Sequence, residues 1–125
     1  MVIAERGEIL LRILIMSAGI YNLSIEQGSS WELQMAIDSS AGTDLNISGY
    51  SFDAKMAKSY YDDTPVSMTV SVVNSATGAI KISLSPAQTG ALDAAIEYIY
   101  DVDMTSGGGT VTRLMEGRAT ISPGL

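Results

Sequence analysis

Acidic side chains recur at even spacing late in the chain, and they are the first candidates for chemistry in this sequence. Glu97, Asp101 and Asp103 share one face if the segment is a β-strand, because successive strand residues point to opposite sides. A row of carboxylates suits calcium, and two carboxylates across a cleft suit glycoside hydrolysis. The sequence has no EF-hand pattern and no spacing that demands a catalytic pair. We therefore expect a solvated face whose acids pair across a hairpin with Arg113 or Arg118.

The missing residue types narrow the chemistry further. The 125 residues include no cysteine, which excludes disulfides, thiolate metal sites and a cysteine nucleophile. They include no histidine, which removes the usual zinc ligand and any Ser-His-Asp triad. The net charge is −7, and nucleic-acid affinity comes largely from Lys and Arg on phosphates. We expect no enzyme, no cofactor, no metal and no nucleic-acid partner.

Two adjacent tyrosines followed by two acids form the second candidate site, Tyr60, Tyr61, Asp62 and Asp63. Exposed tyrosines are typical of protein interfaces. Aromatic rings beside acids also occur in loops that stack on sugars, and a third interpretation folds the tyrosines back as a lid on the core. We take these four residues as a candidate protein interface, with the lid and the glycan as alternatives.

The elements that must position these residues are strands, because the hydrophobic period from Ile20 onward is two. The glycines 107–109 separate the last two strands and lack the following lysine and helix of a phosphate loop, so we expect a hairpin turn. Arg113 falls on the apolar side of its strand, and either a bulge or a strand end near it would account for this. The residues expected to face the core include Tyr21, Leu23, Ile25, Trp31, Leu33, Met35, Ile37, Tyr50, Phe52, Ala54, Met56, Val66, Met68, Val70, Val72, Ile80, Ile82, Leu84, Tyr98, Tyr100, Val102, Met104, Val111, Met115, Ala119 and Ile121.

One segment departs from strand spacing. Ser85 can cap a helix whose first residue is Pro86, so a short helical turn near residues 86–92 should cross between two sheets. About seven strands with regular turn signals predict an all-β, antiparallel β-sandwich.

The chain divides into an N-terminal extension, residues 1–15, and a β-sandwich domain, residues 16–125. The extension is too short and too interrupted by charge to span a bilayer, and it lacks a signal-peptide cleavage site, so we expect no membrane partner. It could form an amphipathic helix, pair as an extra strand, or lie upstream of a natural start at Met16. If it is ordered, its apolar residues should pack on a neighbour.

Four segments together resemble a family of small virion proteins from tailed bacteriophages. The order and spacing of the segments carry the resemblance, which covers about residues 20–123. The segments are GIYNLSIEQGSSW (19–31), DLNISGYSFDAKM (44–56), TGAIKISLSPAQTGAL (77–92) and YIYDVDMTSGGGTVTRLMEGRATISP (98–123).

The resemblance implies an immunoglobulin-like sandwich in the virion, associated with the tail, neck or baseplate and assembled in the host cytoplasm. It implies no catalytic residue. The expected function is therefore that of a non-enzymatic adaptor or decoration module, which binds other virion proteins and forms a homo-oligomer. The alternative is a carbohydrate-binding module that attaches the particle to a host surface. That alternative needs exposed aromatics such as Tyr60 and Tyr61 or Trp31, whereas we expect Trp31 to be buried.

Overall fold

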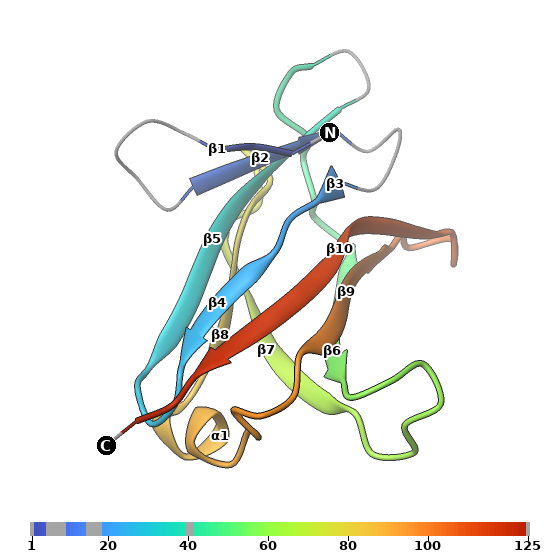
Figure 1. The fold of residues 1–125 in the computed structure, drawn as a ribbon. Coiled ribbons are helices and arrows are strands. Elements are labelled where there is room, and N and C mark those ends of the chain that lie inside the picture. Colours follow the sequence, from blue (N-terminus) through green and yellow to red (C-terminus); the bar gives the residue numbers. More distant parts are fainter. Residues whose placement is uncertain (1, 5–9, 15–18, 40–41, 125) are drawn as a thin grey trace.

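The computed structural model describes residues 2–4, 10–14, 19–39 and 42–124 (Figure 1). These residues form ten strands and one short helix, so the all-β prediction is confirmed. The elements are β1 (Val2–Ala4), β2 (Leu10–Leu14), β3 (Gly19–Ile20), β4 (Leu23–Glu26), β5 (Trp31–Asp38), β6 (Ser51–Ala57), β7 (Val66–Asn74), β8 (Ala79–Leu84), α1 (Pro86–Gly90), β9 (Tyr98–Thr105) and β10 (Val111–Ser122).

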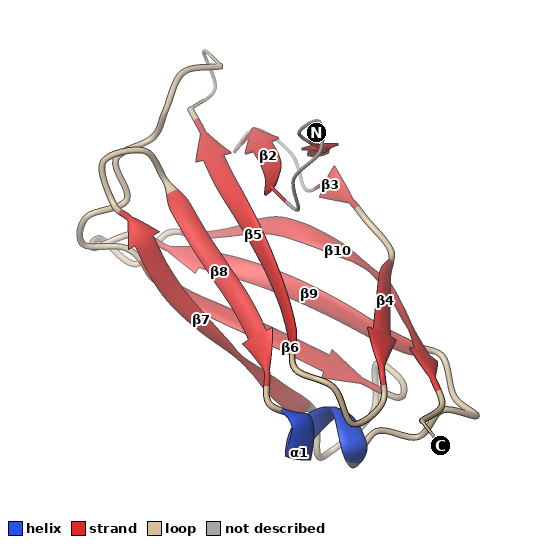
Figure 2. Ribbon diagram, turned by 90° about the vertical axis from the view of Figure 1, so that its left-hand side faces the viewer, coloured by secondary structure: helices blue, strands red, loops and turns tan. Residues whose placement is uncertain are grey.

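One hydrogen-bonded path connects the strands and curls around the core. Its order is β1-β2-β5-β8-β7-β6-β9-β10-β3, with β4 also on β10. Strand β7 joins the two halves, because Met68 pairs with Ala54 of β6 whereas Thr69 pairs with Ser83 of β8. Strands β5 and β8 therefore lie on one side of the core and β9 and β10 on the other (Figures 1 and 2). The two layers are halves of one curled sheet.

The strand order has features that also occur in immunoglobulin-like sandwiches, although here the pairing of β6 with β7 makes the sheet continuous. If β5 to β10 are lettered B to G, then B, E and D form one half of the path and C, F and G the other. The start of β9 carries a second mark of such domains, a tyrosine whose hydroxyl binds the backbone a few residues upstream. The Tyr98 hydroxyl accepts a hydrogen bond of 2.8 Å from the backbone N–H of Asp93.

The predicted antiparallel pairing holds for β5 to β10, but the sheet as a whole is mixed. Strands β3 and β4 run parallel to β10, and β2 runs parallel to β5. Between β3 and β4 the backbone of Tyr21 passes close to Gly117, where a Cβ atom would lie only 2.4 Å from the Tyr21 carbonyl oxygen. The Tyr100 hydroxyl donates a hydrogen bond to that same oxygen. A glycine in β10 thus leaves the space that the parallel edge needs.

The core follows the predicted alternation along β4, β8 and β9 and along the first half of β5, whereas the second half of β5 is buried at every position from Met35 to Asp38. A register shift between Arg113 and Met115 confirms the predicted bulge, and it lets Leu114 and Met115 both point into the core. Large side chains that are fully buried include Ile25, Met35, Ile37, Ile47, Met56, Ile80, Ile82, Val102, Leu114 and Met115.

Eight residues expected in the core are not fully buried. Six of them pack against the core and are partly buried, namely Tyr21, Trp31, Tyr50, Phe52, Val66 and Val70, and the other two, Val72 and Val111, are exposed. Trp31 packs against the core but is only partly buried, because it is the first residue of β5 and lies at the end of the sheet. Val72 is 49% exposed, next to a second register shift near the end of β7. Val111 is 62% exposed and begins β10 at the hairpin tip.

Helix α1 connects the two halves, as predicted, and its start has the predicted cap. The Ser85 hydroxyl accepts from the Gln88 N–H at 3.2 Å, and the Gln88 side chain accepts from the Ser85 N–H at 2.8 Å. This capping box satisfies two N–H groups that a helix start otherwise leaves without partners.

Helix α1 and the residues that follow it also form hydrogen bonds with the turn between β4 and β5. The buried Thr89 hydroxyl donates to the Ser29 carbonyl at 2.8 Å and accepts from the Gly28 N–H at 3.0 Å. The Gln27 side-chain amide donates to the Leu92 carbonyl at 2.8 Å. We call these contacts the helix clasp.

The backbone of residues 2–4 and 10–14 forms strands, which answers the choice between a helix and an extra strand for this segment. Strand β2 pairs with β5 of the same chain, so the segment adds to the sheet. The division into an extension, 1–15, and a domain, 16–125, stays a prediction.

Candidate functional site

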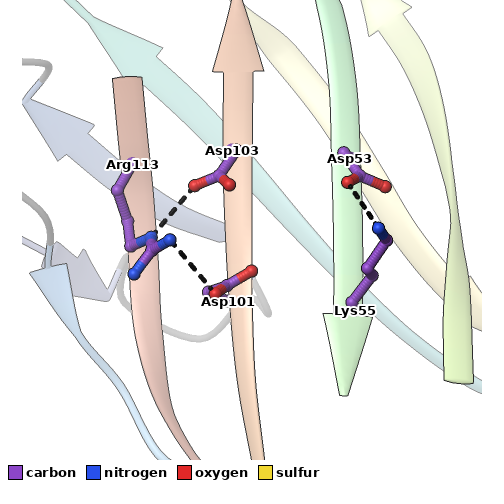
Figure 3. A network of polar contacts seen from close by, with 5 residues as sticks. All are labelled: Asp53, Lys55, Asp101, Asp103 and Arg113. Atoms are coloured by element: carbon purple, nitrogen blue, oxygen red, sulfur yellow. Dashed lines mark hydrogen bonds and ion pairs between the residues drawn. The ribbon is translucent and has the colours of Figure 1, made fainter. Parts of the chain in front are cut away.

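Strands β6, β9 and β10 turn a charged face outward, and their register arranges the charges in rows. Asp53 of β6 lies opposite Asp103 of β9, which lies opposite Arg113 of β10. Two residues away on β6 and β9, and three on β10 because of the bulge, Lys55 lies opposite Asp101, which lies opposite Glu116. Figure 3 shows the side chains of Asp101 and Asp103 converging on Arg113, while the Lys55 side chain turns toward Asp53 of its own strand.

Arg113 holds both aspartates of β9. Its Nε atom donates to the Asp103 carboxylate at 3.0 Å, and its terminal nitrogen lies 3.3 Å from the Asp101 carboxylate (Figure 3). Farther along the hairpin, Arg118 lies 3.1 Å from the carboxylate of Glu97. The predicted cross-hairpin pairing of these acids with Arg113 and Arg118 is confirmed.

Asp101 sits in an unfavourable electrostatic position despite this pairing. Burial raises the pKa of its carboxyl, and the nearby carboxylates of Asp103, Asp53 and Glu116 raise it further, against the lowering effect of Arg113. The pKa of Arg113 is raised in turn, mainly by its hydrogen bond to Asp103.

The face as a whole carries more acids than bases. Lys55 lies 3.4 Å from Asp53, so the pairs described above engage every base of this face. Glu116 forms no ion pair within the described residues. Among the described residues, His, Cys, Asp and Glu form no group of three that could hold a metal ion. The acids are Asp53, Glu97, Asp101, Asp103 and Glu116, and the bases are Lys55, Arg113 and Arg118.

The tyrosine loop stands beside this face, after β6. Tyr60 is 85% exposed and Tyr61 is 92% exposed, so the interpretation of these tyrosines as a lid on the core is wrong. The loop backbone is held by Asp62, whose carboxylate accepts from the Thr64 N–H at 2.9 Å and from the Lys58 N–H at 3.1 Å. These hydrogen bonds lower the pKa of the Asp62 carboxyl, and the one from the Thr64 N–H has the larger effect.

A groove of about 500 Å³ runs over the charged face between the tyrosine loop and the edge strand β3. Tyr60 and Pro65 line it from the loop, and Ile20 lines it from β3. The floor includes Ala57 and Ile99, which lie opposite each other in neighbouring strands. Charged residues that line the groove are Lys55, Asp62, Asp101, Arg113, Glu116 and Arg118.

The structure brings two of the predicted site residues, Tyr60 and Asp62, into the groove lining, and Tyr61 lies next to them on the same loop. Trp31 belongs to β5 and does not line the groove. Sequence reasoning missed Ile20, which is 80% exposed. A signal was present, because Ile20 has the opposite parity to the core residues Leu23 and Ile25.

No helix among the residues that the structure describes has the length and apolar character needed to cross a bilayer. No protein-family model matches the chain, and comparison with curated proteins likewise gives no match.

Proposed function

We propose that this chain is a non-enzymatic structural component of a tailed phage particle, an adaptor or decoration module of the tail, neck or baseplate. The phage context rests on the resemblance carried by the four sequence segments. The mode of action, binding of other proteins, rests on the surface geometry.

The observation that carries the binding role is the exposure of Tyr60 and Tyr61 on a braced loop. Large aromatic side chains bury much apolar area when a partner covers them, and tyrosine is enriched at interfaces for this reason. Asp62 holds the loop backbone through two N–H groups, which reduces the conformational entropy lost on binding. The outer charges of the neighbouring strands are largely paired with each other, which suits an interface rim.

The test replaces both tyrosines with serine in the full chain, Tyr60→Ser with Tyr61→Ser, and measures incorporation into phage particles. The matched control replaces Val72 and Val73 with serine, since these residues are also exposed and apolar but lie on β7. We expect the tyrosine variant to fold but not to be incorporated into particles. We expect the control variant to be incorporated like the natural chain. Equal incorporation of the tyrosine variant and the natural chain would overturn the proposal.

The carbohydrate-binding alternative uses the same two rings, because exposed tyrosines can also stack on sugars. A glycan array with the purified chain separates the two functions. Glycan binding that the tyrosine variant loses would replace assembly with host-surface attachment. An array without signal, together with failed incorporation of the tyrosine variant, would support assembly.

A further inference from the structure

We propose that the groove between Tyr60 and Ile20 binds an extended protein segment that carries an apolar residue and, two positions away, a lysine or arginine. The inference deepens the proposed function and rests on it, because it names the chemistry of the partner that the module would hold.

The apolar part of the groove receives the first of these side chains. Ala57, Ile99 and Arg118 form one row across β6, β9 and β10, and the small Ala57 side chain leaves space above the floor. Tyr60 and Ile20 stand at opposite edges of these three strands, and both are more than three-quarters exposed. An aliphatic side chain over Ile99 would bury apolar surface on these walls.

The charged part of the groove selects the second side chain. Lys55, Asp101 and Glu116 form the next row, and Ile20 follows Glu116 in register. Glu116 forms no ion pair within the described residues, and Lys55 is engaged by Asp53 at 3.4 Å. Asp101 shares its only nearby arginine with Asp103 among the residues described. A cationic group placed between Asp101 and Glu116 would offset this surplus of negative charge, whereas a carboxylate would add to it.

The spacing of the two rows matches the spacing of an extended chain. Ile99 and Asp101 are two residues apart on β9, which corresponds to about 6.6 Å along a strand. An extended partner segment repeats its side chains on one face at the same interval. A segment lying along β9 can therefore place an apolar residue over Ile99 and a cation over Asp101 together.

The experiment uses the full chain and two blocked peptides of seven residues as probes. One is acetyl-Thr-Thr-Leu-Thr-Lys-Thr-Thr-amide, and the other has Glu in place of Lys. Chemical shifts of backbone amides are followed by NMR as each peptide is added. We expect the lysine peptide to shift amides of β6, β9 and β10 around residues 55–57, 99–101 and 116–118, and to bind more tightly than the glutamate peptide.

Charge reversal at Glu116 provides the decisive variant. Glu116→Lys should weaken binding of the lysine peptide about tenfold, as expected for the loss of a hydrogen bond between charged groups. Glu116→Gln, which adds no positive charge, should weaken it less. Glu32→Lys is the matched control, because it makes the same change of net charge on β5, which lies outside the groove, and it should leave the affinity unchanged.

Three outcomes would overturn the inference. They are the absence of binding by the lysine peptide at millimolar concentration, shifts that map outside the groove, and equal weakening by Glu116→Lys and Glu32→Lys. These failures are distinct from failure of the assembly proposal, which is read from incorporation of the tyrosine variant into particles.

Discussion

At the scale of single residues, two aspartates of this surface sit in opposite electrostatic environments. The Asp62 carboxylate receives two backbone N–H groups, and its pKa is lowered from 3.8. The Asp101 carboxyl is partly buried among other acids, and its pKa is raised from the same 3.8. Folding therefore favours the ionised form of Asp62 and the protonated form of Asp101.

The two residues should consequently give opposite pH dependences of stability. As pH rises from the lowered pKa of Asp62 to 3.8, the folded chain gains stability from Asp62, so Asp62→Asn should become relatively less stable over this interval. As pH rises from 3.8 through the raised pKa of Asp101, the folded chain loses stability from Asp101, so Asp101→Asn should become relatively more stable. Urea unfolding of both variants and the natural chain between pH 2.5 and 7 measures the two trends. Trends of the same sign would contradict the assignment.

At the scale of elements, the segments that carry the phage resemblance contact one another in the fold. The turn formed by residues 27–29 of the first segment is hydrogen-bonded to Thr89 and Leu92 of the third. The Tyr21 carbonyl of the first segment receives the Tyr100 hydroxyl of the fourth. These contacts therefore fix the positions of α1 and of the parallel edge, where Ile20 of β3 lines one side of the groove.

Thr89→Val should remove the hydroxyl of the helix clasp while keeping the side-chain shape. The Gly28 N–H and the Ser29 carbonyl would each lose the hydrogen bond that the buried Thr89 hydroxyl makes. Two bonds of about 0.5–1.5 kcal/mol each predict a loss of about 1–3 kcal/mol in the free energy of unfolding. Thr64→Val is the matched control, since the Thr64 hydroxyl lies at the surface, and it should change stability by less than about 0.5 kcal/mol. Urea denaturation measures both variants. Equal losses in the free energy of unfolding would show that the helix clasp contributes no more to stability than the surface hydroxyl of Thr64.

The sequence predicts those elements whose signal is local. Alternation marks β8 and β9, Ser85 and Pro86 mark the helix start, and the misplaced phase of Arg113 marks the bulge. The parallel pairing of β4 with β10 has no local signal, because its partners, such as Leu23 and Ala119, lie 96 residues apart in the sequence. The groove could not be predicted for the same reason, because it requires Ile20 to lie beside strands that are far from it in the sequence.

At the scale of the whole molecule, β7 makes one sheet out of two layers. Its first residues pair with β6 and its later residues with β8, so neither half can separate without breaking hydrogen bonds of this strand. Buried residues of both halves, among them Ile80 and Ile82 of β8 and Val102 of β9, also belong to one hydrophobic cluster.

We therefore expect the two halves to unfold as one cooperative unit. Native-state hydrogen exchange should give the same opening free energy for the slowest amides of β8 and of β9, and this value should equal the global free energy of unfolding. A difference of more than about 1 kcal/mol between the two strands would show separate units and would contradict a role for β7 as the joint.

The bulge in β10 has a consequence for how this chain can change over evolutionary time. Leu114 is the extra residue that keeps Arg113 outside while Met115 points inward. Loss of a single codon there would turn the guanidinium into the interior and leave two aspartates without their counterion, or else slide the hairpin tip by one position. Substitutions can change the side chains of this surface one at a time. The number of residues in β10 at this point is constrained, because it determines which side chains face the core and which face outward.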